Sequence, residues 1–200
     1  LSGEYGQAAA DTLAYDLEQA AALLEEAGYT KGEDGLLYNR RDPAEVTLLV
    51  NSDNDARQAI ANRLAQALEE LGVTVTVTRL PWSGYTAALA AGNFDLYLGE
   101  VRLTGDFDPT ALLAGELNYG GFYSEELSAR LAQWRAARGE GRAQAASALW
   151  EQFAQEAPIA PVCFKRGSLL MRWGMAANLT PTRANPYYQM DQWITTGYGR

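Results

Sequence analysis

Val46-Thr47-Leu48-Leu49-Val50 and Val73-Thr74-Val75-Thr76-Val77 are the two strand-like runs that decide the fold of this chain. The first is mostly apolar, and the second alternates valine with threonine at the two-residue period of a strand. Between them, apolar residues recur at the spacing of one helix face, at Ile60, Leu64, Leu68 and Leu71. Gly72 then ends that helix. A strand, a helix and a strand with short connections predict a βαβ unit, in which the two strands are parallel and the crossover is right-handed.

A second crossover follows directly. Ser83 is expected to cap the next helix, Tyr85 and Leu89 share its apolar face, and Gly92 ends it. Residues 94–98 then predict a third strand. Because a parallel sheet needs helices on its faces, the fold class is α/β, with a central, mainly parallel sheet flanked by helices.

Upstream of this unit, Asp16 is placed to cap a helix that ends at Gly28. Its apolar residues recur at helical spacing, at Leu17, Ala20, Leu24 and Ala27. Residues 29–43 are rich in glycine and charge and are expected to form a solvated surface segment, a loop or hairpin with a short strand at Gly35-Leu36-Leu37-Tyr38.

Two amphipathic helices are predicted downstream. The first follows Ser124 and carries its apolar face on Leu127, Leu131 and Trp134. The second carries its face on Ala146, Leu149, Trp150, Phe153 and Ala157. The proline-flanked apolar run 159–164 is consistent with an edge strand, and no firm element is predicted from 169 to 200.

The composition is that of a water-soluble globular protein and excludes several functions. The chain has 200 residues, 48% of them hydrophobic, which is enough for one domain or at most two small ones. Its 25 acidic and 16 basic residues give a net charge of −9, the wrong sign for gripping the phosphates of nucleic acid. Histidine is absent, which removes Ser-His-Asp and Cys-His catalysis and most zinc and non-haem iron sites.

Cys163 is the one cysteine, so no internal disulfide can form. Its apolar surroundings favour a small core residue over a reactive thiol. No apolar stretch approaches the roughly 20 residues that span a membrane, and Leu1-Ser2-Gly3-Glu4 lacks the pattern of a signal peptide. Any export signal is expected to belong to a part of the protein outside this chain.

Three loops follow the predicted strands, where open α/β sheets bind their ligands. They are residues 51–54, 80–83 and 99–109. The third is the richest in chemistry, because it holds one guanidinium and three carboxylates, those of Arg102, Glu100, Asp106 and Asp108. An arginine grips a carboxylate with two hydrogen bonds, and an aspartate receives an ammonium or hydroxyl group.

Structural roles compete for the same residues. Asp108-Pro109 is also a good helix start, with aspartate as the cap. For Trp82, a core position at the helix entry is favoured over stacking on a ligand. Glu100, Arg102 and Asp106 have the alternative of a local ion pair. Glu100 with Asp106 or Asp108 is also compatible with the carboxylate pair of a glycoside hydrolase.

Six short motifs follow one another from Tyr15 to about Val162. They are Tyr15-Asp16 leading to Ala27-Gly28-Tyr29, Leu71-Gly72-Val73-Thr74-Val75, Trp82-Ser83-Gly84-Tyr85 with Gly92-Asn93-Phe94-Asp95, Asp106-Phe107-Asp108-Pro109, Asn118-Tyr119 leading to Tyr123, and Ala157-Pro158-Ile159-Ala160-Pro161. In this order they resemble the family 5 extracellular solute-binding proteins of ABC transporters, which capture oligopeptides, dipeptides or nickel chelates.

The resemblance implies a type II periplasmic-binding-protein-like fold, in which two lobes close on a ligand. The motifs belong to the carboxyl-terminal lobe of the family. The chain is therefore expected to be a single solute-binding lobe, with a lead-in at 1–14, an α/β core at 15–166 and an irregular tail at 167–200, and without the amino-terminal lobe.

The same resemblance implies the partners and the location. The expected partners are a small-molecule or peptide ligand, the amino-terminal lobe of the same receptor and an ABC transporter permease. Nucleic acid is not expected as a partner, and the protein is expected to be a monomer. The location is extracytoplasmic, either periplasmic or as a cell-surface lipoprotein. No catalytic residue, metal ligand or cofactor is expected.

Peptide-binding members carry a GW-x-x-D arrangement whose tryptophan and aspartate meet the ligand. Here Glu100 follows Gly99, so the tryptophan is missing, and Asp106 is the nearest equivalent of that aspartate. The residues expected to face the cleft are Trp82, Glu100, Arg102, Thr104, Asp106, Asn118 and Tyr119. A carboxylate-based hydrolase such as a glycosidase, and a structural interaction module, stay as the competing hypotheses.

Overall fold

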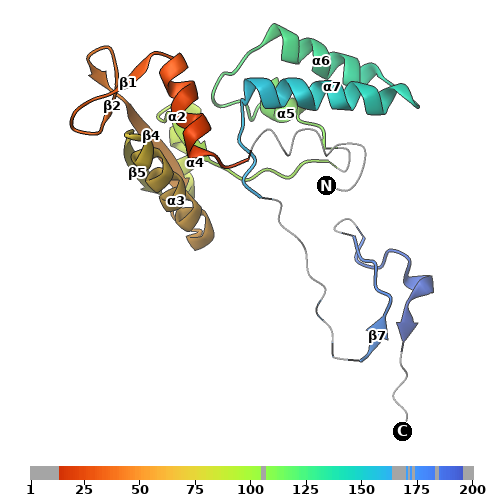
Figure 1. Cartoon of the computed structure of the whole chain (residues 1–200). Helices are drawn as coiled ribbons and strands as arrows, with labels where there is room; N and C mark the ends of the chain where they lie inside the picture. The colour runs from red at the N-terminus through yellow and green to blue at the C-terminus, as the bar shows by residue number, and fades with distance from the viewer. Residues whose placement is uncertain are drawn as a thin grey trace. The chain divides into compact units, whose positions relative to one another are not determined.

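The computed structural model describes residues 14–104, 107–163, 170, 172, 174–182 and 185–195. The chain divides into two compact units, one ending at Pro158 and one beginning at Ile159. Sequence analysis placed the end of the core at residue 166. Each unit is described by itself below, and Figure 1 traces the elements of both.

A three-stranded parallel sheet forms the centre of the first unit. Its strands are β4 (Glu45–Asn51), β5 (Thr74–Leu80) and β6 (Leu96–Leu98), in the order β5-β4-β6. Helix α3 (Asp55–Leu71) connects β4 to β5, and α4 (Trp82–Ala91) connects β5 to β6. The predicted βαβ unit and the second crossover are therefore confirmed.

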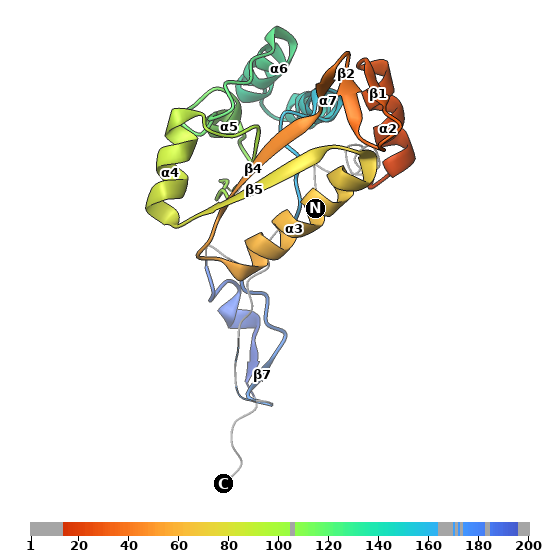
Figure 2. The same ribbon diagram turned by 90° about the vertical axis from the view of Figure 1, so that its left-hand side faces the viewer.

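The two faces of β4 pack against different helices, as Figure 2 shows for α3 and α4 on either side of the sheet. Leu48 and Val50 lie in one buried cluster with Ala61 of α3. Leu49, between them in the sequence, lies in another cluster with Tyr85 and Leu89 of α4. Because neighbouring residues of a strand point to opposite faces, this central strand is buried on both sides and needs a continuous apolar run.

Alanines, rather than the predicted leucines, form the buried face of α3. Ala61 and Ala65 are buried, whereas Leu64 is 37% exposed. Small side chains let the helix backbone approach the sheet closely, and a position one residue away is turned by about 100° around the helix. The expectation for Leu64 is wrong for this reason.

Strand β6 is shorter than the predicted 94–98, and at its start Asp95 pairs with Thr47 through both backbone and side chain: its backbone N–H donates to the Thr47 carbonyl oxygen at 3.1 Å. The Asp95 carboxylate accepts a hydrogen bond from the backbone N–H of Thr47 at 2.7 Å. Regular pairing with β4 begins at Leu96, which lies opposite Leu48.

Helix α2 (Leu17–Glu26) precedes a small antiparallel sheet, so the hairpin alternative for residues 29–43 is confirmed, and most of its strand residues are exposed. The Asp16 side chain caps α2, as predicted. The sheet consists of β1 (Tyr29–Lys31), β2 (Leu37–Asn39) and β3 (Asp42–Pro43). It is anchored at Leu37, which is buried and whose backbone N–H donates to the Gly72 carbonyl oxygen.

Three helices complete the first unit: α5 (Thr110–Leu113), α6 (Glu125–Ala136) and α7 (Gly141–Glu156). The Ser124 hydroxyl caps α6, and the predicted faces of α6 and α7 are largely confirmed. Trp150 is only half-buried, and Ala157 is exposed because it follows the last turn of α7 in a left-handed conformation.

The second unit contains little regular structure. Residues 159–163 form no strand, so the predicted edge strand is not found in the described part of that run; Phe164 lies outside the described residues. Cys163 is exposed, which overturns its assignment to the core. Further on lie a two-stranded ribbon, β7 (Ala176–Ala177) with β8 (Ile194–Thr195), and a short 3-10 helix, η1 (Met190–Gln192). In the described part of the chain, no helix combines the length and apolar character needed to cross a bilayer.

Candidate functional site

The carboxyl ends of the three parallel strands meet at one edge of the sheet. The register places Asn51 at the end of β4 opposite Leu80 at the end of β5, and Val50 opposite Leu98 of β6. The three loops that sequence analysis selected therefore start side by side. This edge is where open α/β sheets bind ligands.

A buried amide and a carboxylate connect the first two loops. Asn51 is 3% exposed, and its Nδ2 donates to Asp53 Oδ2 at 3.2 Å and to the Leu80 carbonyl oxygen at 3.4 Å. The same Asp53 oxygen accepts the backbone N–H of Trp82 at 2.9 Å. Helix α4 begins at Trp82 after Pro81, so the expected cap Ser83 lies inside the helix. Asp53, from the neighbouring loop, caps α4 in its place.

Trp82 is exposed at the start of α4. Its side chain retains 59% of its accessible surface, which overturns the expectation of a core position. The indole stacks on the buried ring of Tyr85, with centroids 5.8 Å apart and planes inclined by 27°. Tyr85 and Leu89 occupy the buried face of the helix, so Trp82 is left as an aromatic surface supported from one side.

An ion pair joins α3 to the third loop. Arg57 Nη2 lies 2.6 Å from Glu100 Oε2, and the side chains are 19% and 37% exposed. Sequence analysis expected Glu100 to face the cleft, with a local ion pair within its own loop as the alternative, and missed Arg57. The signal for Arg57 was its position three residues after the helix cap Asn54, whose side chain accepts the Arg57 backbone N–H.

Three tyrosines, Tyr85, Tyr97 and Tyr119, lie near one another at the end of β6. The Tyr85 hydroxyl donates to the Leu98 carbonyl oxygen at 3.2 Å, and the ring of Tyr97 contacts the ring of Tyr119 edge-on at 6.2 Å. Burial raises the pKa of Tyr85 to about 12, with a further contribution from Tyr97, and the positive charge of Arg57 opposes the rise. Burial and the neighbouring Tyr119 also raise the pKa of Tyr97. The hydroxyl groups of Tyr85 and Tyr97 are therefore neutral hydrogen-bonding groups at physiological pH.

The other predicted residues have different roles. Arg102 and Thr104 are exposed in the third loop, and Asp106 lies outside the described residues. Asn118 braces its own loop: its Nδ2 donates to the carbonyl oxygens of Leu113 and Phe122, and its Oδ1 accepts the N–H of Phe122. These hydrogen bonds give Asn118 a structural role in its own loop. Tyr119, in contrast, is 37% exposed.

The carboxylates required by the hydrolase hypothesis have structural partners. Glu100 is paired with Arg57. Asp108 Oδ1 accepts the first N–H of α5, that of Thr110, at 2.8 Å and also the Thr110 hydroxyl, although Pro109, rather than the predicted Asp108, occupies the cap position. The described residues therefore give no specific support for an acid and nucleophile pair.

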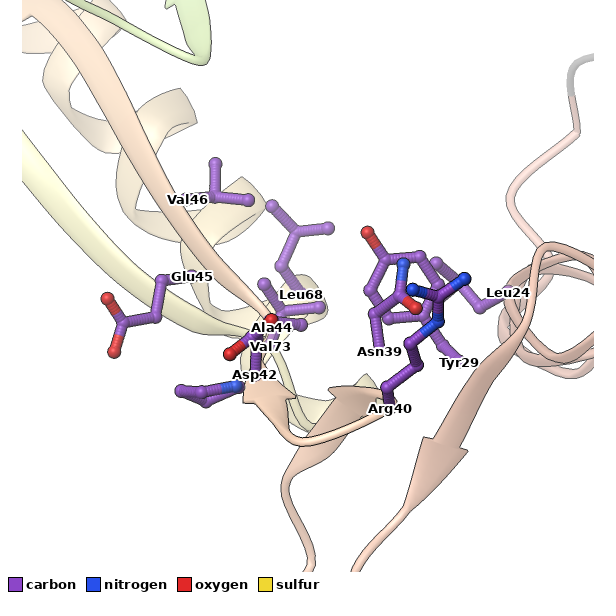
Figure 3. Close-up of a pocket in the computed structure, with 11 residues that line it drawn as sticks. Leu24, Tyr29, Asn39, Arg40, Asp42, Ala44, Glu45, Val46, Leu68 and Val73 are labelled. Carbon is purple, nitrogen blue, oxygen red and sulfur yellow. The ribbon is translucent and has the colours of Figure 1, made fainter.

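A separate hollow of about 650 Å³ lies at the opposite, amino-terminal end of the strands (Figure 3). Apolar residues of α2, β4, α3 and the loop before β5 line it, together with the polar end of β2; among them are Leu24, Val46, Leu68, Val73, Asn39 and Arg40. None of the residues predicted to face the cleft lines this hollow.

Comparison with known proteins gives one family. The family model described as "Bacterial extracellular solute-binding proteins, family 5 Middle" matches residues 2–121. A curated relative, a probable ABC transporter-binding protein of Deinococcus radiodurans, is 32% identical over 103 residues, which represent 48% of this chain and 17% of the relative.

Solved structures agree in fold. NikZ from Campylobacter jejuni in complex with Ni(L-His) matches with a TM-score of 0.64 at 20% identity, over 72% of this chain and 31% of its own. A periplasmic oligopeptide-binding protein from Thermotoga maritima bound to mannohexaose matches with a TM-score of 0.70 at 21% identity, over 92% of this chain and 37% of its own. AppA from Bacillus subtilis in complex with a nonapeptide matches with a TM-score of 0.60 at 20% identity, over 72% and 30%.

These likenesses confirm the predicted fold class, a type II periplasmic-binding-protein-like α/β architecture. The chain spans less than two fifths of the length of each of these solved proteins, and about one sixth of the curated relative.

Proposed function

Because this chain belongs to the family 5 bacterial extracellular solute-binding proteins, we propose that it is one lobe of a receptor that captures a small solute for an ABC import system. In this proposal, a second lobe closes over the ligand and the loaded receptor delivers it to a membrane permease. The place of action is extracytoplasmic, and the receptor is a monomer. The family match over residues 2–121 is the observation that carries this proposal.

The ligand is proposed to bind at the carboxyl ends of β4, β5 and β6. Trp82 and Tyr119 offer exposed aromatic surface there, and Glu100 is held beside them by Arg57. Arg102, Thr104 and Asp106, from the loop after β6, complete the proposed set. Asn118 contributes by fixing the conformation of the loop that carries Tyr119.

An oligopeptide or a similar small solute is the proposed cargo. The solved relatives are bound to a nickel–histidine complex, a nonapeptide and mannohexaose, so the fold accommodates solutes of very different chemistry. The identity of the cargo therefore depends on the side chains of this particular site.

Alanine substitution of the third loop tests the proposal. In the complete receptor, Arg102→Ala or Asp106→Ala is expected to weaken ligand binding by about 1 to 3 kcal/mol, the effect of losing a hydrogen bond to a charged group. The free energy of unfolding should change less than the free energy of binding. Calorimetric titration and denaturant unfolding measure the two quantities.

Two outcomes would contradict the proposal. Unchanged dissociation constants in both variants would mean that Arg102 and Asp106 do not contact the ligand, which would favour the local ion pair. Turnover of a chromogenic glycoside or peptide panel by the receptor would favour the hydrolase, because a binding protein releases its ligand unchanged.

A further inference from the structure

The carboxylates described at the site already have hydrogen-bonding partners. Asp53 accepts from Trp82 N and Asn51, Asp108 accepts the first N–H of α5, and Glu100 is paired with Arg57. An ammonium group entering beside Glu100 would also meet the positive charge of Arg57 and would be repelled by it. The described part of the site is thus poorly suited to a ligand that depends on its own positive charge.

The Arg57–Glu100 pair is instead suited to hydroxyl groups. A guanidinium only donates hydrogen bonds and a carboxylate only accepts them, and here the two groups lie 2.6 Å apart. Exposures of 19% and 37% leave part of both groups accessible. Two adjacent hydroxyl groups of a ligand can therefore accept from Arg57 and donate to Glu100 at the same time, without any net charge on the ligand.

The aromatic surface beside the pair is suited to a flat apolar ring face. Trp82 is 59% exposed and rests on Tyr85, whose ring supports it from one side. The face of an aromatic ring carries negative charge density and attracts weakly positive C–H groups. The axial C–H groups on one side of a pyranose ring form such a patch, while its hydroxyl groups point outward around the rim.

Tyr85 connects the two features. Its ring stacks on Trp82, and its hydroxyl donates at 3.2 Å to the carbonyl oxygen of Leu98, two residues before Glu100. A ligand ring on Trp82 is consequently near donors and acceptors on the same edge of the sheet. A saccharide is an uncharged ligand that has both features, an apolar ring face and hydroxyl groups around the edge of the ring.

We propose that the site at the carboxyl ends of β4, β5 and β6 takes a neutral saccharide, with a pyranose face on Trp82 and adjacent hydroxyl groups on Arg57 and Glu100. This inference rests on the proposed receptor function and specifies its cargo. Trp82 and the Arg57–Glu100 pair are the residues that determine the specificity.

The experiment titrates the ¹⁵N-labelled chain with maltotriose and mannotriose, and follows the indole N–H of Trp82 and the side-chain N–H groups of Arg57 by NMR. Trialanine, with free ends, and N-acetyltryptophanamide, which has a ring but no hydroxyl groups, serve as comparison probes. We expect at least one trisaccharide to shift both sets of signals, with a dissociation constant in the millimolar range. Neither comparison probe should shift them to a similar extent.

Variants assign the binding to the named residues. Trp82→Ala is expected to weaken trisaccharide binding about tenfold, and Trp82→Phe to retain part of it, because a smaller ring still offers a face. Arg57→Lys should also weaken binding, since an ammonium cannot reproduce the planar, two-pronged donor. Tyr123→Ala removes an aromatic ring that is 79% exposed and is not assigned to the site, so it should bind like the unchanged chain.

The failures are distinguishable. If trialanine shifts these signals and the trisaccharides do not, the saccharide inference is wrong while the receptor function stands. Equal binding of N-acetyltryptophanamide and trisaccharide, or trisaccharide binding unaffected by Trp82→Ala, also overturns the inference. The receptor function itself is tested separately: it fails if the complete receptor turns over a chromogenic glycoside or peptide, or if it binds no peptide, saccharide or nickel chelate.

Discussion

The two ends of the parallel sheet differ in what their residues do. At the amino-terminal end, a hollow of about 650 Å³ lies over mostly apolar side chains, and Gly72 packs against the turn between β1 and β2. At the carboxyl end, Asn51 and Asp53 connect two loops, and the Arg57–Glu100 pair connects α3 to a third. The described hollow is therefore at one end, and the polar and aromatic groups of the proposed site are at the other.

This contrast separates the volume of a hollow from the chemistry of its lining. Ligand sites combine apolar surface with a few polar groups placed to converge on the ligand. The carboxyl end has exposed aromatic surface beside charged and amide groups, which is why the proposed site lies there. We expect substitutions at the amino-terminal end to change stability, and substitutions at the carboxyl end to change binding.

The largest expected effect follows from the proposal that the carboxyl end is one wall of a two-lobed cleft. If half of a micromolar interaction, about 8 kcal/mol in total, comes from this wall, the chain alone should bind at roughly millimolar concentration. The complete receptor should then bind about a thousandfold more tightly. Titration of the same ligand into both, by calorimetry or chemical-shift change, measures the difference. Comparable affinities would mean that this chain holds a complete site.

The next largest effect is expected at Gly72. This residue ends α3 with φ at +98°, and a Cβ there would lie 2.6 Å from the Gly35 carbonyl oxygen and 3.0 Å from the Leu37 nitrogen. Gly72→Ala should therefore destabilise the chain by about 3 kcal/mol, through left-handed strain and overpacking together. Denaturant unfolding measures the loss, and ligand binding by the folded fraction should persist.

Gly92 provides the matched control. It ends α4 with φ at +70°, but a Cβ there would meet nothing within 4 Å. Gly92→Ala should cost only the conformational strain, about 1 kcal/mol. Equal losses in the two variants would mean that the close packing of Gly72 against the hairpin does not contribute to stability.

The sequence predicted the sheet more accurately than its surroundings, for a physical reason. A central parallel strand is buried on both faces, so Leu48, Leu49 and Val50 must all be apolar, and the pattern is visible without a structure. The apolar run containing Cys163 resembled a strand as well. In the described part of that run, however, Pro158 and Pro161 offer no N–H for a ladder, and no strand pairs with it.

The sequence identified the strand ends that lie side by side but not the contacts between their loops. The strand ends identify the loops, and chain order cannot reveal that Glu100 pairs with Arg57, 43 residues away. For the same reason Trp82 was expected in the core. Its exposure depends on where α4 begins, and that is determined by Asp53 from another loop.

A smaller effect concerns alkaline pH and the buried tyrosine beside the site. The pKa of Tyr85 is raised from 10.0 to about 12, mainly by burial. Between these pH values an unfolded chain releases the Tyr85 proton while the folded chain keeps it, so the stability must fall as pH rises above 10. At about 1.4 kcal/mol for each pKa unit, the loss by pH 11 should be about 1 to 2 kcal/mol.

Tyr85→Phe tests this assignment. The variant loses the hydrogen bond to the Leu98 carbonyl oxygen and is expected to be less stable at pH 8. Its unfolding free energy should then decline less steeply from pH 9 to pH 11 than that of the unchanged chain. Identical slopes would assign the alkaline loss to other groups, Tyr97 first among them.

The smallest expected change in stability is also the most informative about the carboxyl end. Asp53→Ala removes the acceptor of the Trp82 N–H at the start of α4 and should destabilise the chain by about 1 kcal/mol, the typical effect of a lost helix cap. Asp53→Asn keeps an oxygen at the same place and should preserve most of the stability. Thermal unfolding measures both variants, with an expected decrease of roughly 2 to 4 °C in Tm for alanine.

Binding separates a positioning role for Asp53 from a purely structural one. If Asp53 holds Trp82 on the ring of Tyr85, the alanine variant should bind trisaccharide more weakly even at temperatures where it is fully folded, and asparagine should restore the binding. The near-ultraviolet circular dichroism of the stacked Trp82 and Tyr85 should change in parallel. A folded Asp53→Ala chain with unaltered trisaccharide affinity would show that Trp82 keeps its position without the cap. The hydrogen bonds of Asp53 with Asn51 and Trp82 would then contribute to stability alone, as the packing of Gly72 does at the other end of the sheet.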